Sequence, residues 1–311
     1  MGPAGSGTSS GQRLREGGTR PCVSLAYPRQ PGRVPRMPML TVNRTDLYYE
    51  DSGGTGVPVV FSHGLLWSCR LFDPQVEALC GRYRCIAYDH RGQGQSAVPP
   101  ARVIDMETVY LDAVALIERL GVGPCHFVGL SMGGFVGMRI AARRPDLLRS
   151  LVLMETSADR EPLHNVPRYT LLNLTARLAG LRPVADPVMR IMFGRSFMTD
   201  PNRAEERSRW RTRLMENRRD IWRAVNGVIE RRGVAHEIPH IRVPTLVVVG
   251  AEDTATVPAK AQRLHRLIPG SRLVTLPRGG HSSTVEEPAL VNATLGTFLD
   301  AQLETRTSRA V

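Results

Sequence analysis

The chain has 311 residues, of which 42% are hydrophobic, enough for a sizeable core in one large α/β domain or two small ones. No run approaches the ~18 consecutive apolar residues that cross a bilayer, which argues against a membrane-spanning role. The formal net charge of +12 comes from arginines scattered along the chain, with Lys260 as the single lysine, and no nucleic-acid-binding module accompanies it, so we expect no nucleic-acid partner.

Residues 1–38 are rich in glycine, proline, serine and arginine and lack hydrophobic periodicity. Such a segment buries too little apolar surface to offset the entropy lost on ordering, so we expect a disordered extension. Its six arginines against one acidic residue, Glu16, are compatible with an organelle transit peptide, but the amphipathic face is missing. We favour an over-extended start, with Met37 or Met39 beginning the natural protein.

The cysteines show no spacing typical of a metal site, and no metal or organic cofactor is expected. An odd number of cysteines without a secretory signal favours free thiols in a reducing compartment, which predicts a cytoplasmic protein. The five are Cys22, Cys69, Cys80, Cys85 and Cys125.

From Leu40 onward, apolar runs alternate with helical periodicity. Strands alternating with helices imply right-handed βαβ crossovers and a mostly parallel sheet. Continuous apolar runs, such as residues 246–249, suit strands that are buried on both faces. Strands are expected at 40–42, 47–49, 57–62, 83–88, 125–130, 148–154, 245–249 and 272–276, and helices at 106–120, 132–143, 258–267 and 285–303.

The alternation stops between residues 157 and 238, where helical runs and prolines occur without a convincing strand. At roughly 80 residues, this insertion is much longer than a structureless surface loop. We therefore expect a core made of residues 39–156 and 239–304, a helical insertion at 157–238, and a flexible tail at 305–311. The arginines of the insertion could attract an acidic substrate, but we favour a solvated helical face.

A single serine lies between glycines in the stretch V-G-L-S-M-G-G-F at residues 128–135. The pattern G-x-S-x-G follows one expected strand and opens the next helix, which is the setting of a nucleophile elbow. In such a turn the serine has a strained backbone, and the flanking Gly129 and Gly133 avoid collisions across the turn. Ser131 is therefore the expected nucleophile.

A serine hydroxyl needs a base, and the base needs an acid that orients it. His281, in the glycine-flanked loop R-G-G-H-S after the last expected strand, is the expected base. Asp253 follows the strand at 245–249, and the order serine, aspartate, histidine along the chain suits this chemistry. The neighbouring Glu252, and Glu155 after the strand at 148–154, remain alternatives for the acid.

An oxyanion that forms during attack needs two backbone donors. The N–H of Met132, directly after the serine, is one. The loop S-H-G-L-L-W at 62–67 should supply the second, and the N–H of Leu65 is the best candidate because Gly64 lets the backbone approach.

These motifs resemble the α/β-hydrolase superfamily from about residue 40 to residue 303. His63-Gly64, the run D-H-R-G-Q-G-Q-S at 89–96, G-L-S-M-G-G at 129–134, Asp253 and Gly280-His281 fall in the family's order. The resemblance implies an α/β-hydrolase fold: a mostly parallel eight-stranded sheet flanked by helices, with the insertion as a lid over the active site. It also gives the run at 89–96 a structural rather than a chemical role.

The segment R-L-F-D-P-Q at 70–75 is similar to the 3-oxoadipate enol-lactonase, esterase and non-haem haloperoxidase branch of the superfamily. A serine nucleophile argues against haloalkane dehalogenase and epoxide hydrolase chemistry. We expect Trp67, Phe193 and Phe197 to contact the substrate in the pocket that the lid shapes.

The expected function is hydrolysis of a small carboxylic ester or lactone through an acyl-enzyme on Ser131. C–C bond hydrolysis or perhydrolysis with the same three residues is an alternative within enzymes. A non-catalytic small-molecule receptor on the same fold is an alternative from another class, although a receptor does not need all three residues. Nothing in the sequence indicates the oligomeric state.

Overall fold

The eight strands expected from the sequence all form and join in one sheet of order β1-β2-β4-β3-β5-β6-β7-β8. β2 pairs antiparallel with β1 and β4, and the other pairs are parallel. The computed structural model describes residues 38–307, with side chains to residue 303. The strands are β1 Met39–Val42, β2 Thr45–Asp51, β3 Pro58–Ser62, β4 Arg84–Tyr88, β5 Cys125–Leu130, β6 Leu148–Met154, β7 Thr245–Gly250 and β8 Arg272–Leu276.

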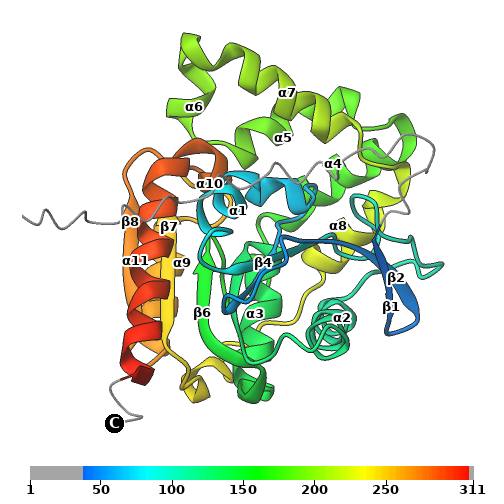
Figure 1. Cartoon of the computed structure of the whole chain (residues 1–311). Helices are drawn as coiled ribbons and strands as arrows, with labels where there is room; N and C mark the ends of the chain where they lie inside the picture. Colours follow the sequence, from blue (N-terminus) through cyan, green and yellow to red (C-terminus); the bar gives the residue numbers. More distant parts are fainter. Residues whose placement is uncertain (1–37, 308–311) are drawn as a thin grey trace, which may run out of the picture.

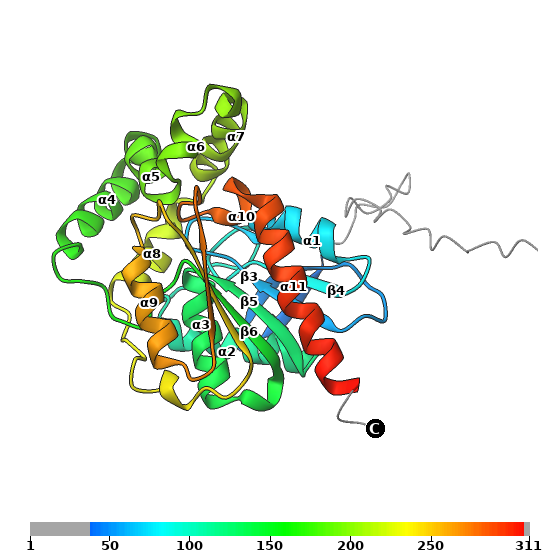
Figure 2. The same cartoon turned by 90° about the vertical axis from the view of Figure 1, so that its left-hand side faces the viewer.

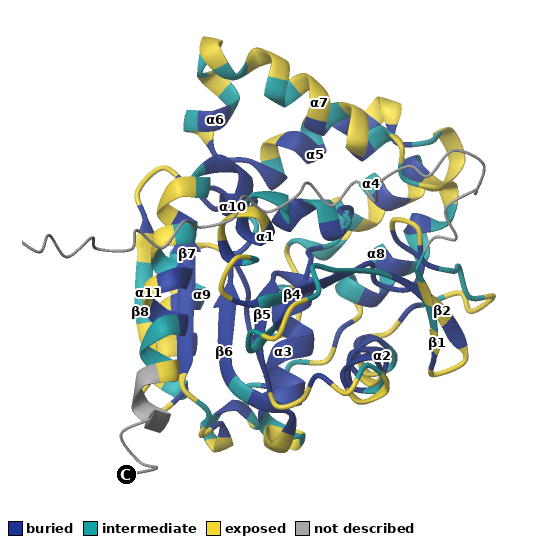
Figure 3. Ribbon diagram, viewed as in Figure 1, coloured by how far each residue is buried: buried dark blue, intermediate teal, exposed yellow. Residues whose placement is uncertain are grey.

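Helices cover both faces of the sheet, so its central strands are buried on both sides (Figures 2 and 3). Every residue of β5 and β7 is buried, which explains their continuous apolar runs. Helices α1 and α11 pack together on one face, and α2 and α3 pack together on the other. The core helices are α1 Asp73–Leu79, α2 Met106–Arg119, α3 Met132–Arg143, α9 Pro258–Leu267, α10 Ser283–Glu286 and α11 Pro288–Thr307.

Two helices differ from the sequence prediction. The single helix expected at 285–303 is two helices, because Pro288 starts α11 and cannot continue the hydrogen bonding of α10. Helix α1 was not expected, since its seven residues span too few turns to show a clear apolar period.

The residues between β6 and β7 form a separate helical layer above the carboxyl ends of the parallel strands (Figure 1). Within this layer α4 packs on α8, and α5 packs on α7. The arginine-rich α7 directs Arg209 and Arg211 outward into exposed ion pairs, as a solvated helical face requires. The helices are α4 Val166–Ala179, α5 Ala185–Met192, α6 Arg195–Thr199, α7 Ala204–Met215 and α8 Trp222–Ile229.

The expected disordered extension lies outside the described residues, apart from Pro38. Residues 305–307, expected in a flexible tail, belong to α11, and the rest of that expected tail lies outside the described residues. Cys69, Cys85 and Cys125 are buried free thiols. The expectation of free thiols throughout is wrong at Cys80, which is disulfide-bonded. No helix within residues 38–307 is both long and apolar enough to span a membrane.

Candidate active site

Ser131 occupies the sharp turn between β5 and α3 with a strained backbone, at φ 52° and ψ −107°. Such a conformation costs a non-glycine residue roughly 1–3 kcal/mol and persists only where the surroundings enforce it. Two hydrogen bonds do so: the Ser131 N–H donates to the Met154 carbonyl at 2.8 Å, and the Thr156 hydroxyl donates to the Ser131 carbonyl at 2.8 Å. The turn therefore fixes where the serine hydroxyl points.

The two flanking glycines are required by close packing. A Cβ added to Gly129 would lie 2.3 Å from the Gly133 carbonyl oxygen. One added to Gly133 would lie 1.9 Å from the carbonyl oxygen of Ser62, at the end of β3. Both distances are far below any real carbon–oxygen contact, so the turn can pack against the sheet only when these positions lack side chains.

The structure brings Ser131, His281 and Asp253 into one hydrogen-bonded chain. The Ser131 Oγ lies 2.9 Å from His281 Nε2, and His281 Nδ1 lies 2.9 Å from Asp253 Oδ2. The carboxyl ends of β5, β7 and β8 carry the three residues or the loops that hold them. All three are more than nine-tenths buried, so little water competes for these hydrogen bonds.

Asp253 is held as a carboxylate by its own loop. The N–H groups of Ala255 and Thr256 donate to Asp253 Oδ1 at 2.8 and 2.9 Å, and the Thr256 hydroxyl donates to Oδ2 at 2.6 Å. Burial opposes ionisation, but His281 and these donors outweigh it and lower the pKa of Asp253. Thr256 Oγ1 also lies 3.2 Å from His281 Nδ1, a contact that the sequence analysis missed.

The two alternative acids do not contact His281, whose ring nitrogens are occupied by Ser131 and Asp253. Glu155 is fully buried, and burial followed by the nearness of Asp253 raises the pKa of Glu155 well above its ordinary value, which favours a protonated side chain at neutral pH. Glu252 instead accepts hydrogen bonds from the N–H and the hydroxyl of Ser196, both at 2.6 Å.

A third carboxyl, Glu286, joins the histidine loop to the helical layer. Its two oxygens accept the N–H of Gly194 at 2.7 Å and the N–H of Ser282 at 3.0 Å. Burial raises the pKa of Glu286 to about 7 despite these donors, and the charge of Asp253 adds to the effect. No local sequence pattern predicts this role of Glu286, because both contacts depend on the folded arrangement.

The expected oxyanion donors lie on the two segments next to Ser131. Met132 is the first residue of α3, and Leu65 follows Gly64, whose added Cβ would lie 3.5 Å from Ser131 Cβ. The next N–H in the loop, that of Leu66, is occupied by a hydrogen bond to Gln93 Oε1 at 2.9 Å. Gln93 belongs to the run at 89–96, so this run supports the loop without joining the chemistry.

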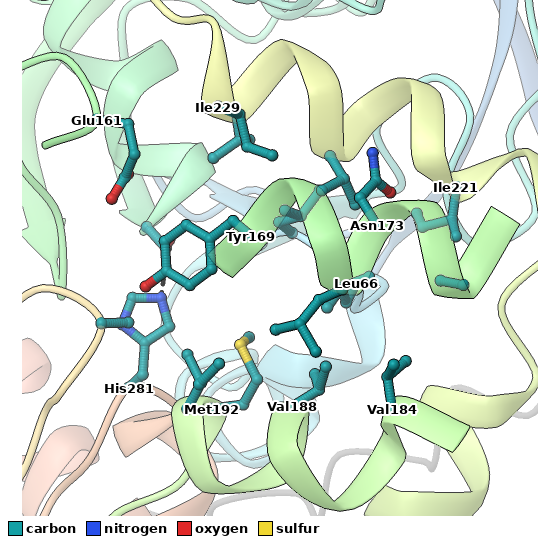
Figure 4. Close-up of a pocket in the computed structure, with 18 of the residues that line it drawn as sticks. Leu66, Glu161, Tyr169, Asn173, Val184, Val188, Met192, Ile221, Ile229 and His281 are labelled. Carbon is teal, nitrogen blue, oxygen red and sulfur yellow. Dashed lines mark hydrogen bonds between the residues drawn. The ribbon is translucent and has the colours of Figure 1, made fainter. Parts of the chain in front are cut away.

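Ser131 and His281 lie in the wall of an apolar cavity between the sheet and the helical layer. Its volume is about 130 Å³. In Figure 4 the labelled His281 lies at one end, with Val184 and Ile221 toward the other. The lining residues are Leu65, Leu66, Ser131, Phe135, Glu161, Tyr169, Leu172, Asn173, Ala176, Leu181, Val184, Val188, Ile191, Met192, Ile221, Val225, Val228, Ile229, Arg231, Ala255, Thr256 and His281.

The three aromatic residues expected to contact the substrate do not line this cavity. Trp67, Phe193 and Phe197 are almost fully buried and pack on one another and on Trp210. Their ring contacts fasten the helical layer to the loop after β3. Aliphatic side chains of α4, α5 and α8 line the cavity beside Ser131, where these aromatic residues were expected.

Among residues 38–307, no group of three or more histidine, cysteine, aspartate or glutamate side chains is arranged to hold a metal ion. The arrangement of Ser131, His281 and Asp253 can generate a serine nucleophile without one, because the imidazole can accept the hydroxyl proton directly.

Comparisons with known proteins agree with this architecture. The sequence model described as "alpha/beta hydrolase fold" matches residues 57–288. The chain is 28% identical over 257 residues to a protein of Acinetobacter baylyi named 3-oxoadipate enol-lactonase 2, which covers 81% of this chain and 92% of that one.

Two solved structures are similar at 28% identity. One is a thermophilic esterase from Thermogutta terrifontis, with a TM-score of 0.79 and coverage of 85% of this chain and 99% of that one. The other is the enol-lactonase from Burkholderia xenovorans LB400, with a TM-score of 0.78 and coverage of 85% and 100%.

Proposed function

Because the chain belongs to the α/β-hydrolase fold family and is a hydrolase that acts on ester bonds, we propose that it cleaves a small carboxylic ester or lactone through an acyl-enzyme on Ser131. The observation that carries the proposal is the continuous hydrogen-bonded chain from Ser131 through His281 to Asp253 at one end of an apolar cavity.

In the first half-reaction, His281 Nε2 accepts the hydroxyl proton as Ser131 Oγ attacks the ester carbonyl. The oxyanion accepts hydrogen bonds from the N–H groups of Leu65 and Met132. When this intermediate collapses, the protonated His281 gives its proton to the leaving alkoxide and the acyl group stays on the serine. Asp253 stabilises the imidazolium and holds the ring in the tautomer that leaves Nε2 free to accept.

In the second half-reaction a water molecule replaces the alcohol. His281 accepts a proton from this water as its oxygen attacks the acyl-enzyme, and the same oxyanion donors stabilise the new intermediate. Collapse releases the carboxylic acid and returns the proton to Ser131. For a lactone, the alcohol and the acid of the product belong to one molecule.

We further propose that residues 157–238 act as a lid and that residues 39–156 and 239–304 form the catalytic core. Support comes from the cavity, whose walls include residues of α4, α5 and α8 together with Ser131 and His281. Figure 4 shows Tyr169 and Met192 of these helices close to His281. A cytoplasmic location also remains a proposal, supported by three buried free thiols and opposed by the disulfide at Cys80. Fractionation of the native cells would test it.

The proposal is tested with short p-nitrophenyl esters and an organophosphonate that labels activated serines. We expect the wild type to hydrolyse the esters and to gain one phosphonyl mass on the peptide that contains Ser131. Ser131→Ala should lose both properties while its circular dichroism spectrum is unchanged. Ser68→Ala, a partly exposed serine outside the cavity, is the matched control and should keep both. Full activity in a folded Ser131→Ala variant would overturn the proposal.

A further inference from the structure

The cavity beside Ser131 contains one buried ion pair whose charges are already balanced. We propose that the cavity accepts an uncharged acyl chain and discriminates against substrates that carry a carboxylate on that chain. This inference rests on the proposed ester hydrolysis at Ser131, and it concerns the class of substrate rather than the reaction.

The walls of the cavity offer little to a charged group. Most of the lining side chains are aliphatic, and several of them come from α4, α5 and α8 of the inserted layer. Apart from His281, Arg231 is the one cationic side chain among the described lining residues, so it is the only guanidinium there that could bind a substrate carboxylate. The state of Arg231 therefore decides whether an anionic acyl chain is accepted.

Arg231 is 6% exposed, and the donors on its Nε and Nη1 bind protein groups. Its Nη1 donates to Glu161 Oε2 and to the Val228 carbonyl, both at 2.8 Å, and its Nε donates to the Asp159 carbonyl at 3.2 Å. The guanidinium also lies over the ring of Phe135, 4.5 Å from the ring centroid. Arg231 is thus fixed in the wall of the cavity, with its charge already balanced by Glu161.

Glu161 is equally committed, because its second oxygen accepts the side-chain amide of Asn165 at 2.9 Å. A substrate carboxylate at the remaining Nη2 donors of Arg231 would be a second anion beside Glu161, with one guanidinium between the two. Burying a second anion next to the first, with no further cation to balance it, is strongly unfavourable. The intact pair therefore disfavours anionic chains.

The test compares two p-nitrophenyl esters with six-carbon acyl chains: the hexanoate, and the adipate monoester with a terminal carboxylate. For the wild type we expect kcat/KM to be roughly 100-fold higher for the hexanoate, which is the scale of an unpaired buried charge. Glu161→Gln frees the charge of Arg231 and should shift this ratio toward the adipate ester by at least about tenfold. Glu205→Gln, on the exposed surface of α7, is the matched control and should leave the ratio unchanged.

The possible outcomes separate the two proposals. A wild type that hydrolyses the adipate ester as fast as the hexanoate overturns the inference but supports ester hydrolysis. A wild type that hydrolyses neither ester contradicts the proposed function and removes the basis of the inference. If Glu161→Gln does not fold, the ratio measured with the wild type still decides between an uncharged and an anionic acyl chain.

A second inference rests on a different observation, the strained backbone of Leu66 in the loop after β3. Leu66 has φ 71°, in the region that leucine rarely adopts, although it is 8% exposed and packed into the core. We infer that Gln93 and Asn217 hold this conformation and thereby act as positioning residues for the neighbouring oxyanion donor, the N–H of Leu65.

Both polar groups of the Leu66 backbone are fixed by side chains from distant segments. The Leu66 N–H donates to Gln93 Oε1 at 2.9 Å, and its carbonyl accepts Asn217 Nδ2 at 2.8 Å. Asn217 also donates to the Leu214 carbonyl at 3.0 Å, which anchors it to the end of α7. The inserted helical layer thus holds one side of the loop and the core holds the other.

Gln93 also approaches the second oxyanion segment. Its Nε2 donates to the sulfur of Met132 at 3.4 Å, so one side chain contacts Met132 and the residue that follows Leu65. Without Gln93, the Leu66 N–H loses the hydrogen bond that stabilises the strained backbone conformation of Leu66. The φ of Leu66 can then relax to a negative value. Relaxation would move the Leu65 N–H away from the oxyanion.

Gln93→Met keeps the length of the side chain but removes the acceptor. We expect kcat for an ester to fall about tenfold with KM within twofold, because the oxyanion forms only after substrate binds. Binding of an alkyl trifluoromethyl ketone, which forms a tetrahedral adduct on the serine, should weaken by a similar factor. Gln93→Glu, which keeps an acceptor at Oε1, should recover part of the lost kcat.

Asn217→Ala should lower kcat and ketone affinity in the same way, and Asn202→Ala, an exposed asparagine of the same layer, is its matched control. An unchanged kcat in both Gln93→Met and Asn217→Ala would overturn the inference. So would a lower kcat with undiminished ketone affinity, because that pattern places the defect outside the oxyanion site. If the wild type does not hydrolyse the ester at all, that result would instead count against the proposed function.

Discussion

Glu286 should make the stability of the fold fall as the pH rises from about 4.5 to about 7. Burial raises the pKa of its carboxyl to about 7 in the folded protein, from an ordinary value of 4.5. The nearby carboxylate of Asp253 opposes its ionisation further, while Arg203 is bonded to the backbone carbonyl of Glu286 rather than to its carboxylate. Folding therefore favours the protonated side chain.

Glu286 holds its proton more tightly in the folded state than in the unfolded state. Between these two pH values the folded state keeps the Glu286 proton and the unfolded state loses it, so stability decreases as pH rises. The contribution is complete below pH 4.5 and lost once the pH passes the folded pKa. Because a tenfold change in proton affinity corresponds to ~1.4 kcal/mol, the two pKa values imply a total loss of about 3 kcal/mol.

Glu286→Gln isolates this contribution, because glutamine has nearly the same shape but does not titrate. The free energy of unfolding would be measured by urea denaturation at several values between pH 4.5 and pH 7.5, using tryptophan fluorescence. The stability of the wild type minus that of the variant should fall by about 3 kcal/mol over this range. A difference that stays constant with pH would refute the reasoning, even if the variant is less stable overall.

Three further predictions concern the candidate active site. Asp253→Asn should lower kcat by roughly 10⁴-fold in an ester assay, whereas Glu155→Gln should keep at least half of the activity because the Glu155 carboxyl is already protonated; the reverse order would make Glu155 the acid. Thr256→Val should lower kcat about tenfold in the same assay through loss of its hydrogen bonds to the acid and the base, and an unchanged kcat would contradict that role. Gly133→Ala should destabilise the fold by roughly 3 kcal/mol or more, measured by urea denaturation, because its Cβ meets the Ser62 carbonyl; a variant as stable as the wild type would refute the packing argument.

The sheet could be predicted from the sequence because a continuous apolar run indicates each strand that is buried on both faces. It also predicted the meeting of Ser131, Asp253 and His281, since parallel strands bring the loops at their carboxyl ends to one edge. These inferences need only local patterns and the connectivity rules of parallel sheets.

Other features depended on contacts that no local pattern encodes. Gln93 and Thr256 are ordinary polar residues until folding places them beside Leu66 and His281. Phe193, where we expected a substrate contact, does not line the cavity beside Ser131. Residue type does not reveal direction, because the same ring can line a cavity or join two layers by packing between them. The direction depends on how α5 and α6 dock on the core.

The insertion between β6 and β7 also has a consequence for the order in which the protein is made. Ser131 precedes the insertion and Asp253 follows it, and the hydrogen bond between Ser131 and His281 joins residues 150 positions apart. A ribosome that has released the sheet only as far as β6 has made the serine turn without its base or its acid. Hydrolytic activity therefore cannot begin on the nascent chain until the strand β8 and the loop of His281 have emerged, which keeps the nucleophile inactive while the polypeptide is still unfinished.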